Sequence, residues 1–530
     1  MAFYGIGTHP ILIRLRIDIP EVKQVWLADD ATGAGNLNFL LKWWKQLIEE
    51  GKKYGYFVKP SKSWLVLKNP NQLEEAQHLF NESPINITTA GKRHLGAAIG
   101  TEEFKNEYMD AKVMKWCSEI KNLSEIAKSQ PHAAYAGFIH GEQHKFTYFL
   151  RTIADITNCL KPLDEMINNT FIPALFGRNI TESEREIISM PIRDGGLGIR
   201  YVAFNADQSY TSSSKITDPL VQKIIEQSTE LPDPETVKNA KARQIISVKE
   251  LETARSSDIK SRQSAELKRS LEQSSEPGAS SWLGALPIAA QDFNLNKGEF
   301  QDALCLRYNM PIKNLPSKCP CGTKFDVTHA LNCKKGGFVN ARHNNIRDME
   351  SKLLQVVCRD VETEPHLQKV VNKQSYASTA NTDDDARPDI RARGFWRQGQ
   401  NAFFDVRVTN ANCKSQRDMK VEAVLRKHEQ EKKTAYNRRV MEVEHGSFTP
   451  LVFTTSGVMS HECTRYHKAL AEKLSEKRNE RYDVIMRYLR VKLSFLSLKA
   501  TLLCLRGSRG GNAIIENGED FGFSLDELGL

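Results

Sequence analysis

Four residues with metal-binding side chains fall within 15 positions of this chain of 530 residues: Cys319, Cys321, His329 and Cys333. Zn²⁺ prefers thiolate and imidazole ligands in a closed tetrahedron where its role is structural. The Cys-x-Cys-Gly segment places two thiolates in one tight turn, and the His-x3-Cys spacing puts the other two side chains on one face of a helical turn. Each thiol alone would be an ordinary packing residue. Taken together, the spacing predicts a zinc knuckle.

A pair of aspartates further along the chain suggests a second kind of metal site. Asp389 lies in ARPDI and Asp405 in NAFFDVRV, and the segment RARGFWRQGQ (391–400) separates these two candidate strands. A hairpin would bring the two carboxylates side by side. Carboxylates so placed hold Mg²⁺, which activates water and stabilises the charge that grows on a phosphodiester. Each acid alone is equally compatible with a Pro-Asp turn or with the exposed face of a strand.

The elements expected around the aspartates form an ordered series. A helix over about 344–359 is followed by strands at VETEP, ARPDI and NAFFDVRV, a charged helix over about 416–440 and a strand at FTPLVFTT. This α-β-β-β-α-β order resembles the core of the PD-(D/E)xK, or restriction-like, nucleases. That family places a catalytic lysine two residues after the second acid. Here Arg407 holds that position, and arginine does not give up a proton near neutral pH.

A narrower resemblance comes from the order of the motifs. A CCHC cluster, the segment ARHNN (341–345), Pro-Asp, a second Asp and then a displaced lysine followed by tyrosine resemble the endonuclease of R2-type non-LTR retrotransposons. The segment HEQEKKTAYN (428–437) supplies Lys432, with Tyr436 four residues later on the same helical face. Lys433 is the competing assignment, and either lysine would otherwise belong to a solvated helical face.

The resemblance implies roles for these residues. Asp389 and Asp405 would hold Mg²⁺, and Lys432 or Lys433 would stabilise charge or orient water. The supporting groups near the phosphate would be Tyr436, Arg342 and His343. The zinc knuckle and the basic helices would bind nucleic acid.

Composition limits the class of protein. Hydrophobic residues make up 40% and aromatic residues 8% of the chain, which suffices for packed cores in about three or four domains. The formal net charge of +9 is compatible with a polyanionic partner. No apolar run reaches the roughly 18 residues of a membrane span, and charged residues interrupt the N-terminal apolar stretch, so a signal peptide is not expected. The cysteines form no secreted framework, which favours a reducing compartment.

The N-terminal region carries a second pair of acids, Asp29 and Asp30, in EVKQVWLADDATGAG. An apolar strand, two adjacent acids and a glycine-containing turn are followed by a helix with paired tryptophans and a strand at SWLVLK. This context resembles the last part of a reverse-transcriptase palm in non-LTR elements; an acidic turn is the simpler alternative. Such a polymerase needs a further aspartate and fingers upstream, but only 28 residues precede Asp29. We therefore expect an N-terminally truncated reverse transcriptase without polymerase activity.

The expected fold class is a multidomain α+β protein. Its parts would be the C-terminal part of a reverse-transcriptase palm (1–100), a helical thumb-like region (101–210), a charged helical linker (211–300), a CCHC zinc knuckle (301–340), a restriction-like endonuclease (341–510) and an acidic tail (511–530).

The function expected is that of a retrotransposon-derived, Mg²⁺-dependent DNA endonuclease, which nicks target DNA for target-primed reverse transcription. The alternative is a catalytically inactive, nucleic-acid-binding remnant of such an element, which would bind with steep salt dependence. The expected partners are DNA and element RNA, with no membrane and no small-molecule substrate. The expected location is the nucleus, after import from the cytoplasm.

Overall fold

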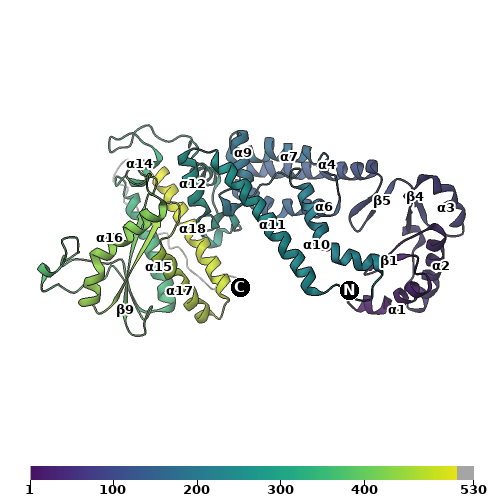
Figure 1. Ribbon diagram of the computed structural model, residues 1–530. Coiled ribbons are helices and arrows are strands. Elements are labelled where there is room, and N and C mark those ends of the chain that lie inside the picture. The colour runs from purple at the N-terminus through teal and green to yellow at the C-terminus, as the bar shows by residue number, and fades with distance from the viewer. Residues whose placement is uncertain (1, 510–530) are drawn as a thin grey trace. The chain divides into compact units, whose positions relative to one another are not determined.

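The computed structural model describes residues 2–509, and the tail expected at 511–530 lies outside the described residues. The fold is mixed α/β, with many helices and small sheets (Figure 1). It divides into two compact units. Unit 1 combines Met1–Ser124, Phe138–Ile172 and Arg200–Arg255. Unit 2 combines Glu125–Gly137, Pro173–Ile199 and the residues from Ser256 onward.

Unit 1 is built from helices and pairs of short strands. Its helices are α1 (Ala2–Asp18), α2 (Leu37–Lys53), η1 (Pro60–Lys62), η2 (Pro70–Gln72), α3 (Leu73–Leu79), most of α4 (Glu102–Ala127), η3 (Phe138–Glu142), α6 (Gln143–Thr152), α7 (Lys161–Met166), η4 (Ile167–Phe171), α10 (Ala206–Glu226) and most of α11 (Pro234–Ser261). Its strands are β1 (Lys23–Leu27), β2 (Asp30–Ala34), β3 (Trp64–Val66), β4 (Asn86–Thr88), β5 (Gly91–His94) and β6 (Ala97–Gly100).

The strands of unit 1 pair two by two. β1–β2 and β5–β6 are antiparallel, whereas β3–β4 is parallel. The helix expected after the acidic pair is α2, which buries Trp43 and Leu47 one turn apart. These side chains pack on Ile11 and Leu15 of α1. The sequence therefore predicted β1 and α2 correctly in kind and place.

Unit 2 holds the longer helices and the largest sheet of the described residues. Its helices are α5 (Pro131–Gly137), α8 (Ile172–Phe176), α9 (Glu182–Ser189), η5 (Ile192–Asp194), α12 (Ala265–Ser275), η6 (Ser281–Gly284), η7 (Ala289–Gln291), α13 (Lys297–Arg307), α14 (Val327–Asn332), α15 (Phe338–Val357), η8 (Lys373–Ser375), α16 (Val421–Glu442), α17 (His461–Arg478) and α18 (Tyr482–Arg506). Its strands are β7 (Arg359–Thr363), β8 (Ile390–Arg393), β9 (Asn401–Thr409) and β10 (Ser447–Thr454).

The sheet of unit 2 has the strand order β10-β9-β8-β7. β7, β8 and β9 are antiparallel neighbours, and β10 runs parallel to β9. The helix–strand order expected from the sequence is therefore present, with α15 before β7 and α16 between β9 and β10. The start of α16 differs from the expectation, because residues 411–419 form a turn region instead. The guanidinium of Arg269 holds that region through the carbonyls of Ala411, Gln416 and Met419.

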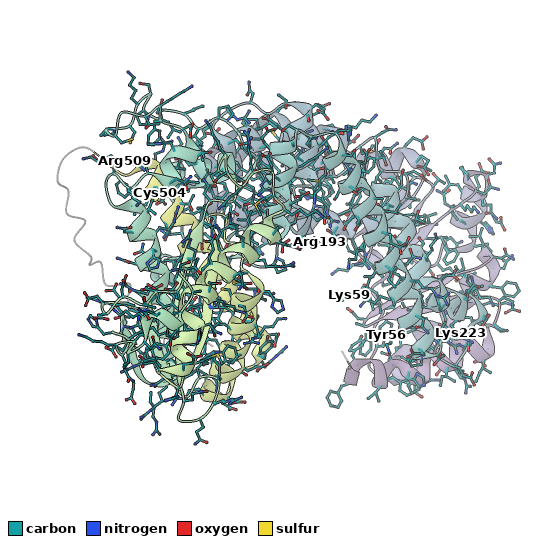
Figure 2. All side chains as sticks on the ribbon, turned by 60° about the vertical axis from the view of Figure 1, so that its left-hand side comes forward. Tyr56, Lys59, Arg193, Lys223, Cys504 and Arg509 are labelled. Atoms are coloured by element: carbon teal, nitrogen blue, oxygen red, sulfur yellow. The ribbon has the colours of Figure 1, made fainter. Side chains whose placement is uncertain are left out.

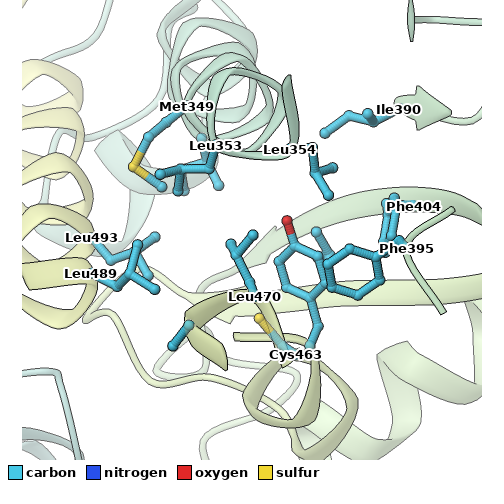
Figure 3. Packing of buried hydrophobic residues seen from close by; sticks show 14 of the residues in the cluster. Met349, Leu353, Leu354, Ile390, Phe395, Phe404, Cys463, Leu470, Leu489 and Leu493 are labelled. Atoms are coloured by element: carbon cyan, nitrogen blue, oxygen red, sulfur yellow. The ribbon is translucent and has the colours of Figure 1, made fainter. Parts of the chain in front are cut away.

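Different helices pack on the two faces of the sheet. Alternate residues of β9 point to opposite faces. Phe404 and Val406 join the apolar core formed with α15, α17 and α18, which includes Leu353 and Leu470 (Figure 3). Phe403 instead packs with Val440 of α16. Asp405 shares the face of Phe403, so the strand's alternation directs this carboxylate toward α16.

Candidate active site and metal centre

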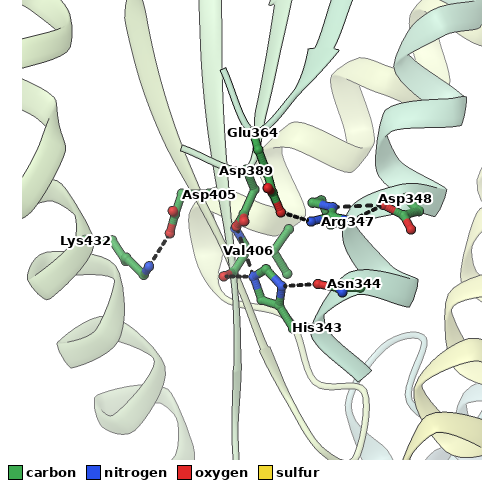
Figure 4. Close-up of polar contacts among 9 residues, drawn as sticks. All are labelled: His343, Asn344, Arg347, Asp348, Glu364, Asp389, Asp405, Val406 and Lys432. Atoms are coloured by element: carbon green, nitrogen blue, oxygen red, sulfur yellow. Dashed lines mark hydrogen bonds and ion pairs between the residues drawn. The ribbon is translucent and has the colours of Figure 1, made fainter. Parts of the chain in front are cut away.

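Asp405 lies on β9 of unit 2, and Asp389 lies at the entrance to the neighbouring strand β8 (Figure 4). Asp389 immediately precedes β8, and Ile390 pairs with Phe404, so the register sets the two aspartates side by side. The backbone N–H of Val406 donates to Asp389 Oδ2 over 2.6 Å. This hydrogen bond turns the Asp389 side chain toward β9. The expected hairpin pairing of the two acids is thus present in the structure.

His343 of α15 contacts Asp389. Its Nε2 lies 3.1 Å from Asp389 Oδ2 and 3.1 Å from the Val406 carbonyl oxygen, and its Nδ1 lies 3.3 Å from Asn344 Oδ1. Nε2 faces two acceptors and must therefore carry a proton. Burial lowers the pKa of His343, but the neighbouring Asp389 outweighs burial and the net pKa lies above the ordinary value. A protonated imidazole at this position neutralises part of the charge on Asp389.

The structure distinguishes the two candidate lysines. Lys432 Nζ lies 2.5 Å from Asp405 Oδ2, whereas Lys433 Nζ lies 2.8 Å from Glu462 Oε1. Successive residues of a helix point about 100° apart, so only one of two adjacent lysines can face the sheet from α16. Lys432 occupies that position, and Lys433 is tied to the start of α17.

Burial changes the acidity of Asp405. The residue is only 3% exposed, and removal from water raises its pKa to about 6, although the nearby Lys432 and His343 act in the opposite direction. The charge of Asp389 raises this pKa further. Within the described residues, no hydrogen bond reaches Oδ1 of either aspartate, and the buried Asp405 Oδ2 has an ion pair with Lys432 but no hydrogen bond, so Oδ1 of each remains available to another ligand.

Tyr436 lies one helical turn after Lys432. Its ring stacks on Phe448 with centroids 5.6 Å apart, and its hydroxyl accepts a hydrogen bond from Asn381 Nδ2 over 3.0 Å. Burial raises the pKa of Tyr436, and the charge of Asp405 adds to this rise. Lys432 Nζ is 5.9 Å from the ring centroid. Tyr436 therefore belongs to the surroundings of the acid pair, as the helical spacing predicted.

The structure does not bring Arg342 to the acid pair. Its side chain is buried and donates to the Leu331 carbonyl over 3.2 Å, with Cys504 Sγ at 3.8 Å. The reason is again helical rotation, since His343 faces the sheet and the preceding residue cannot. Arg407, two residues after Asp405, is exposed. Among residues 2–509, Lys432 is therefore the lysine that takes the place next to the second acid.

A third carboxylate near the pair was not predicted. The Glu364 backbone N–H donates to the Asp389 carbonyl over 2.8 Å, and its carboxylate contacts the Arg347 guanidinium of α15. Figure 4 shows Glu364 next to Asp389. The sequence contained a signal, because this acid is part of the VETEP segment expected to form a strand, and it directly follows the observed strand β7. Because 24 residues lie between Glu364 and Asp389 in the chain, the sequence did not indicate that the two residues are close in space.

The four knuckle residues converge on one point. The ligand atoms of Cys319, Cys321, His329 and Cys333 all lie within 4.8 Å of one another, so the group can hold a metal ion. Gly322 adopts a left-handed φ of 91° in the turn between the first two thiols and α14. Asp326 caps α14 by accepting the backbone N–H of His329 over 2.7 Å. Hydrogen bonds involving Thr323 lower the pKa of Cys321 to about 6, which favours the thiolate form that metals bind.

Buried arginines attach the knuckle to the rest of unit 2. Arg509 donates to the Ala330 carbonyl over 3.2 Å and to the Cys504 carbonyl at the end of α18 (Figure 2). Its guanidinium also covers the rings of Phe325 and Phe338, 5.2 and 5.0 Å from the centroids. Arg342 bonds the same short helix through Leu331. The residue expected near a phosphate thus joins the knuckle to α15.

The N-terminal acids occupy a different environment. β1 and β2 form a hairpin in which Leu27 pairs with Asp30 across a two-residue turn, and Ala28 takes a left-handed φ of 55°. Asp29 and Asp30 are both exposed. The Tyr56 hydroxyl donates to the Asp29 carbonyl over 2.9 Å. Burial raises the pKa of Tyr56 to about 12, and the nearby Tyr4, Asp29 and Asp30 add to the rise.

No protein-family model and no curated protein matches this chain. Within residues 2–509, every helix is too short or too polar to cross a lipid bilayer.

Proposed function

We propose that unit 2 is a Mg²⁺-dependent DNA endonuclease of the kind found in R2-type non-LTR retrotransposons, which nicks target DNA to prime reverse transcription. The observation that carries the proposal is the convergence of Asp389, Asp405 and Lys432 at the centre of one sheet. Two acids and a lysine at such a position are the groups that the restriction-like nucleases use. Glu364 and His343 lie next to Asp389 and add a carboxylate and an imidazole to this group.

The available carboxylate oxygens suit a hard cation. Asp389 and Asp405 would hold Mg²⁺, since Oδ1 of each is available, and the bound ion would supply an activated water and charge stabilisation at the phosphate. His343 keeps Asp389 oriented through Nε2. Lys432 supplies a positive charge next to Asp405, which favours the ionised carboxylate and attracts the phosphodiester. The partly solvated position of Tyr436 suits contact with the nucleic-acid backbone.

The knuckle fits a structural zinc ion. Three thiolates and one imidazole form the CCHC donor set that zinc prefers, and two of the four side chains are buried by more than nine-tenths. The knuckle then acts as a rigid module that binds DNA and element RNA beside the nuclease core. Nuclear localisation belongs to the same proposal, because the target is chromosomal DNA.

We do not extend the proposal to polymerisation. The β1–β2 hairpin resembles the acidic hairpin of a reverse-transcriptase palm. Among the described residues, no third metal-binding side chain joins Asp29 and Asp30 in a cluster. Phosphoryl transfer by a polymerase needs such a cluster to place its metal ions.

The test is nicking of supercoiled plasmid by the purified full-length chain. We expect relaxed circles with Mg²⁺ and none with EDTA. Asp389→Asn removes a charged metal ligand at nearly constant shape, and we expect it to lower the nicking rate by roughly a thousandfold, since metal-bound water and its charge stabilisation are lost. Asn372→Asp makes the same kind of amide-to-carboxylate exchange, in the reverse direction, at an exposed position, and serves as the control variant.

The result separates two functions. Metal-dependent nicking that disappears in Asp389→Asn supports the endonuclease. A chain that retards the plasmid on a gel but never nicks it contradicts the endonuclease and favours a binding protein without catalysis. In that case binding should weaken steeply as salt rises.

A further inference from the structure

Unit 2 contains a cavity that the proposed nuclease chemistry does not use. Its volume is about 180 Å³. Its walls come from α12, η6, α13, the knuckle helix α14, the segments after β9 and β10, and α18. This volume is below the roughly 300 Å³ at which pockets for drug-sized ligands begin, so the cavity suits a single small ring system.

The lining is almost without charge. Arg307 is the one charged side chain among the described residues that line the cavity. Its two terminal nitrogens donate to Ser280 Oγ over 2.5 Å and to the Gly196 carbonyl over 3.1 Å, whereas its buried Nε has no acceptor among the described residues. No carboxylate is present among the lining residues to attract a cation. The lining therefore excludes a cationic ligand, because a buried charge without a partner is costly, and it favours a ligand with hydrogen-bond acceptor atoms.

One wall offers a hydrogen-bond donor that lacks an acceptor. Asn410 is 4% exposed, and no acceptor among the described residues reaches its Nδ2. Its Oδ1 accepts the Asn412 backbone N–H over 3.1 Å, which fixes the orientation of the amide. A buried donor without an acceptor destabilises the fold. Asn410 therefore indicates a ligand that carries a carbonyl oxygen or a ring nitrogen.

The rest of the cavity combines a rigid polar rim with an apolar wall. Gln273 Nε2 donates to Asn412 Oδ1 over 2.7 Å, and Gln273 Oε1 accepts a hydrogen bond from Ser456 over 2.7 Å. Trp282 and Met310 supply buried apolar surface. A flat ring with acceptors on its edge matches both features.

We propose that this cavity binds one unpaired nucleobase, whose edge accepts a hydrogen bond from Asn410. Nucleobases are uncharged and planar, and proteins that bind them outside the duplex combine edge hydrogen bonds with apolar or aromatic surfaces over the ring. Asn410 directly follows β9, five residues after Asp405, so the cavity lies roughly 17 Å along the strand from the acid pair at about 3.3 Å per residue. The inference rests on the proposed function, which supplies the nucleic acid.

The test compares two single strands of equal length and charge on the full-length chain, with zinc supplied and Mg²⁺ omitted. One strand carries bases and the other is abasic throughout. We expect the base-bearing strand to bind at least tenfold more tightly by fluorescence anisotropy, since each base held on a protein surface contributes about 1–3 kcal/mol. Asn410→Asp replaces the donor with an acceptor, and Ser274→Phe fills the cavity from its half-buried rim. Both variants should abolish the discrimination, whereas Asn372→Asp should preserve it.

Free nucleosides, added as competitors, identify the source of the base. If free nucleosides displace the base-bearing strand, the cavity binds the base itself. If they do not, and the base-bearing strand still binds more tightly than the abasic one, the cavity binds a base only within a strand. Equal binding of the two strands by the unaltered chain, or discrimination unchanged in both cavity variants, overturns the proposal. Asp389→Asn should leave the discrimination intact, so failure of the nuclease and failure of the base site are distinguishable.

Discussion

The chain contains two pairs of aspartates that differ in almost every physical respect. Asp29 and Asp30 are adjacent in sequence and exposed at the tip of a two-residue hairpin turn. Asp389 and Asp405 are 16 residues apart in sequence, yet strand pairing sets them side by side. The second pair has a lysine and a histidine against it, and one of its acids is almost completely buried.

The difference shows what makes an acid pair chemically distinct. Adjacency in sequence places two carboxylates at one end of a hairpin, but it supplies neither burial nor a partner of opposite charge. A sheet that directs one acid toward α16 and another toward α15 supplies both. Removal from water strengthens every interaction within the group, and groups with perturbed pKa values concentrate at functional sites. The buried pair is therefore the better candidate for catalysis.

Matched substitutions in the two pairs test this comparison most strongly. Asp405→Asn should lower plasmid nicking by roughly a thousandfold, because the neutral amide cannot hold a cation as the carboxylate does. Asp29→Asn should leave nicking within about twofold, since surface changes away from a site have small effects. Initial rates of relaxed-circle formation at saturating Mg²⁺ provide the measurement.

Equal losses in Asp405→Asn and Asp29→Asn would show that both pairs serve one activity. Thermal unfolding of each variant is the control, because a misfolded variant would lose nicking activity without any change in metal binding. Circular dichroism at a single wavelength suffices for that control.

The next test uses the two adjacent lysines of α16. Lys432→Ala removes the cation 2.5 Å from Asp405 and should lower nicking by about a hundredfold, the usual cost of losing one charge-stabilising group. Lys433→Ala breaks only the contact with Glu462 and should change the rate by less than about threefold. Comparable losses in the two variants would mean that α16 contributes general positive charge rather than one positioned group.

Local spacing patterns in the sequence predicted much of this site. The hairpin spacing predicted that Asp389 and Asp405 would meet, the i, i+4 spacing placed Tyr436 near Lys432, and the Cys/His spacing brought four ligands together. These features depend on a few neighbouring residues, whose geometry is set by the period of a helix or a strand.

Other features depend on packing between distant segments, and the sequence did not predict them. Lys432 and Lys433 are equivalent until the rotation of α16 on the sheet is known. The resemblance of ARHNN to a nuclease motif implied that Arg342 lies near a phosphate, yet the rotation of α15 turns it toward Leu331. Glu364 reaches Asp389 across a long loop, and the cavity beside Asn410 needs walls from many segments. Tertiary contacts of this kind leave no periodic signal in the chain.

The smallest expected effect concerns stability and completes the comparison of the two pairs. Burial raises the pKa of Asp405 to about 6, so the folded chain binds this proton more tightly than the unfolded chain. The stabilisation is fully present below the unfolded pKa and is lost as pH rises through about 6. Between pH 4.5 and pH 7.5 this loss is on the order of 2 kcal/mol. Asp405→Asn cannot ionise and should lack this loss.

Urea unfolding at pH 4.5 and pH 7.5 measures the effect. Between these values the unaltered chain should lose more stability than Asp405→Asn does, whereas Asp29→Asn should follow the unaltered chain, because its carboxylate is exposed in both states. Parallel changes in all three proteins would mean that Asp405 is ionised at little cost in the folded state. The buried pair would then resemble the exposed pair, and burial would no longer be the property that separates them.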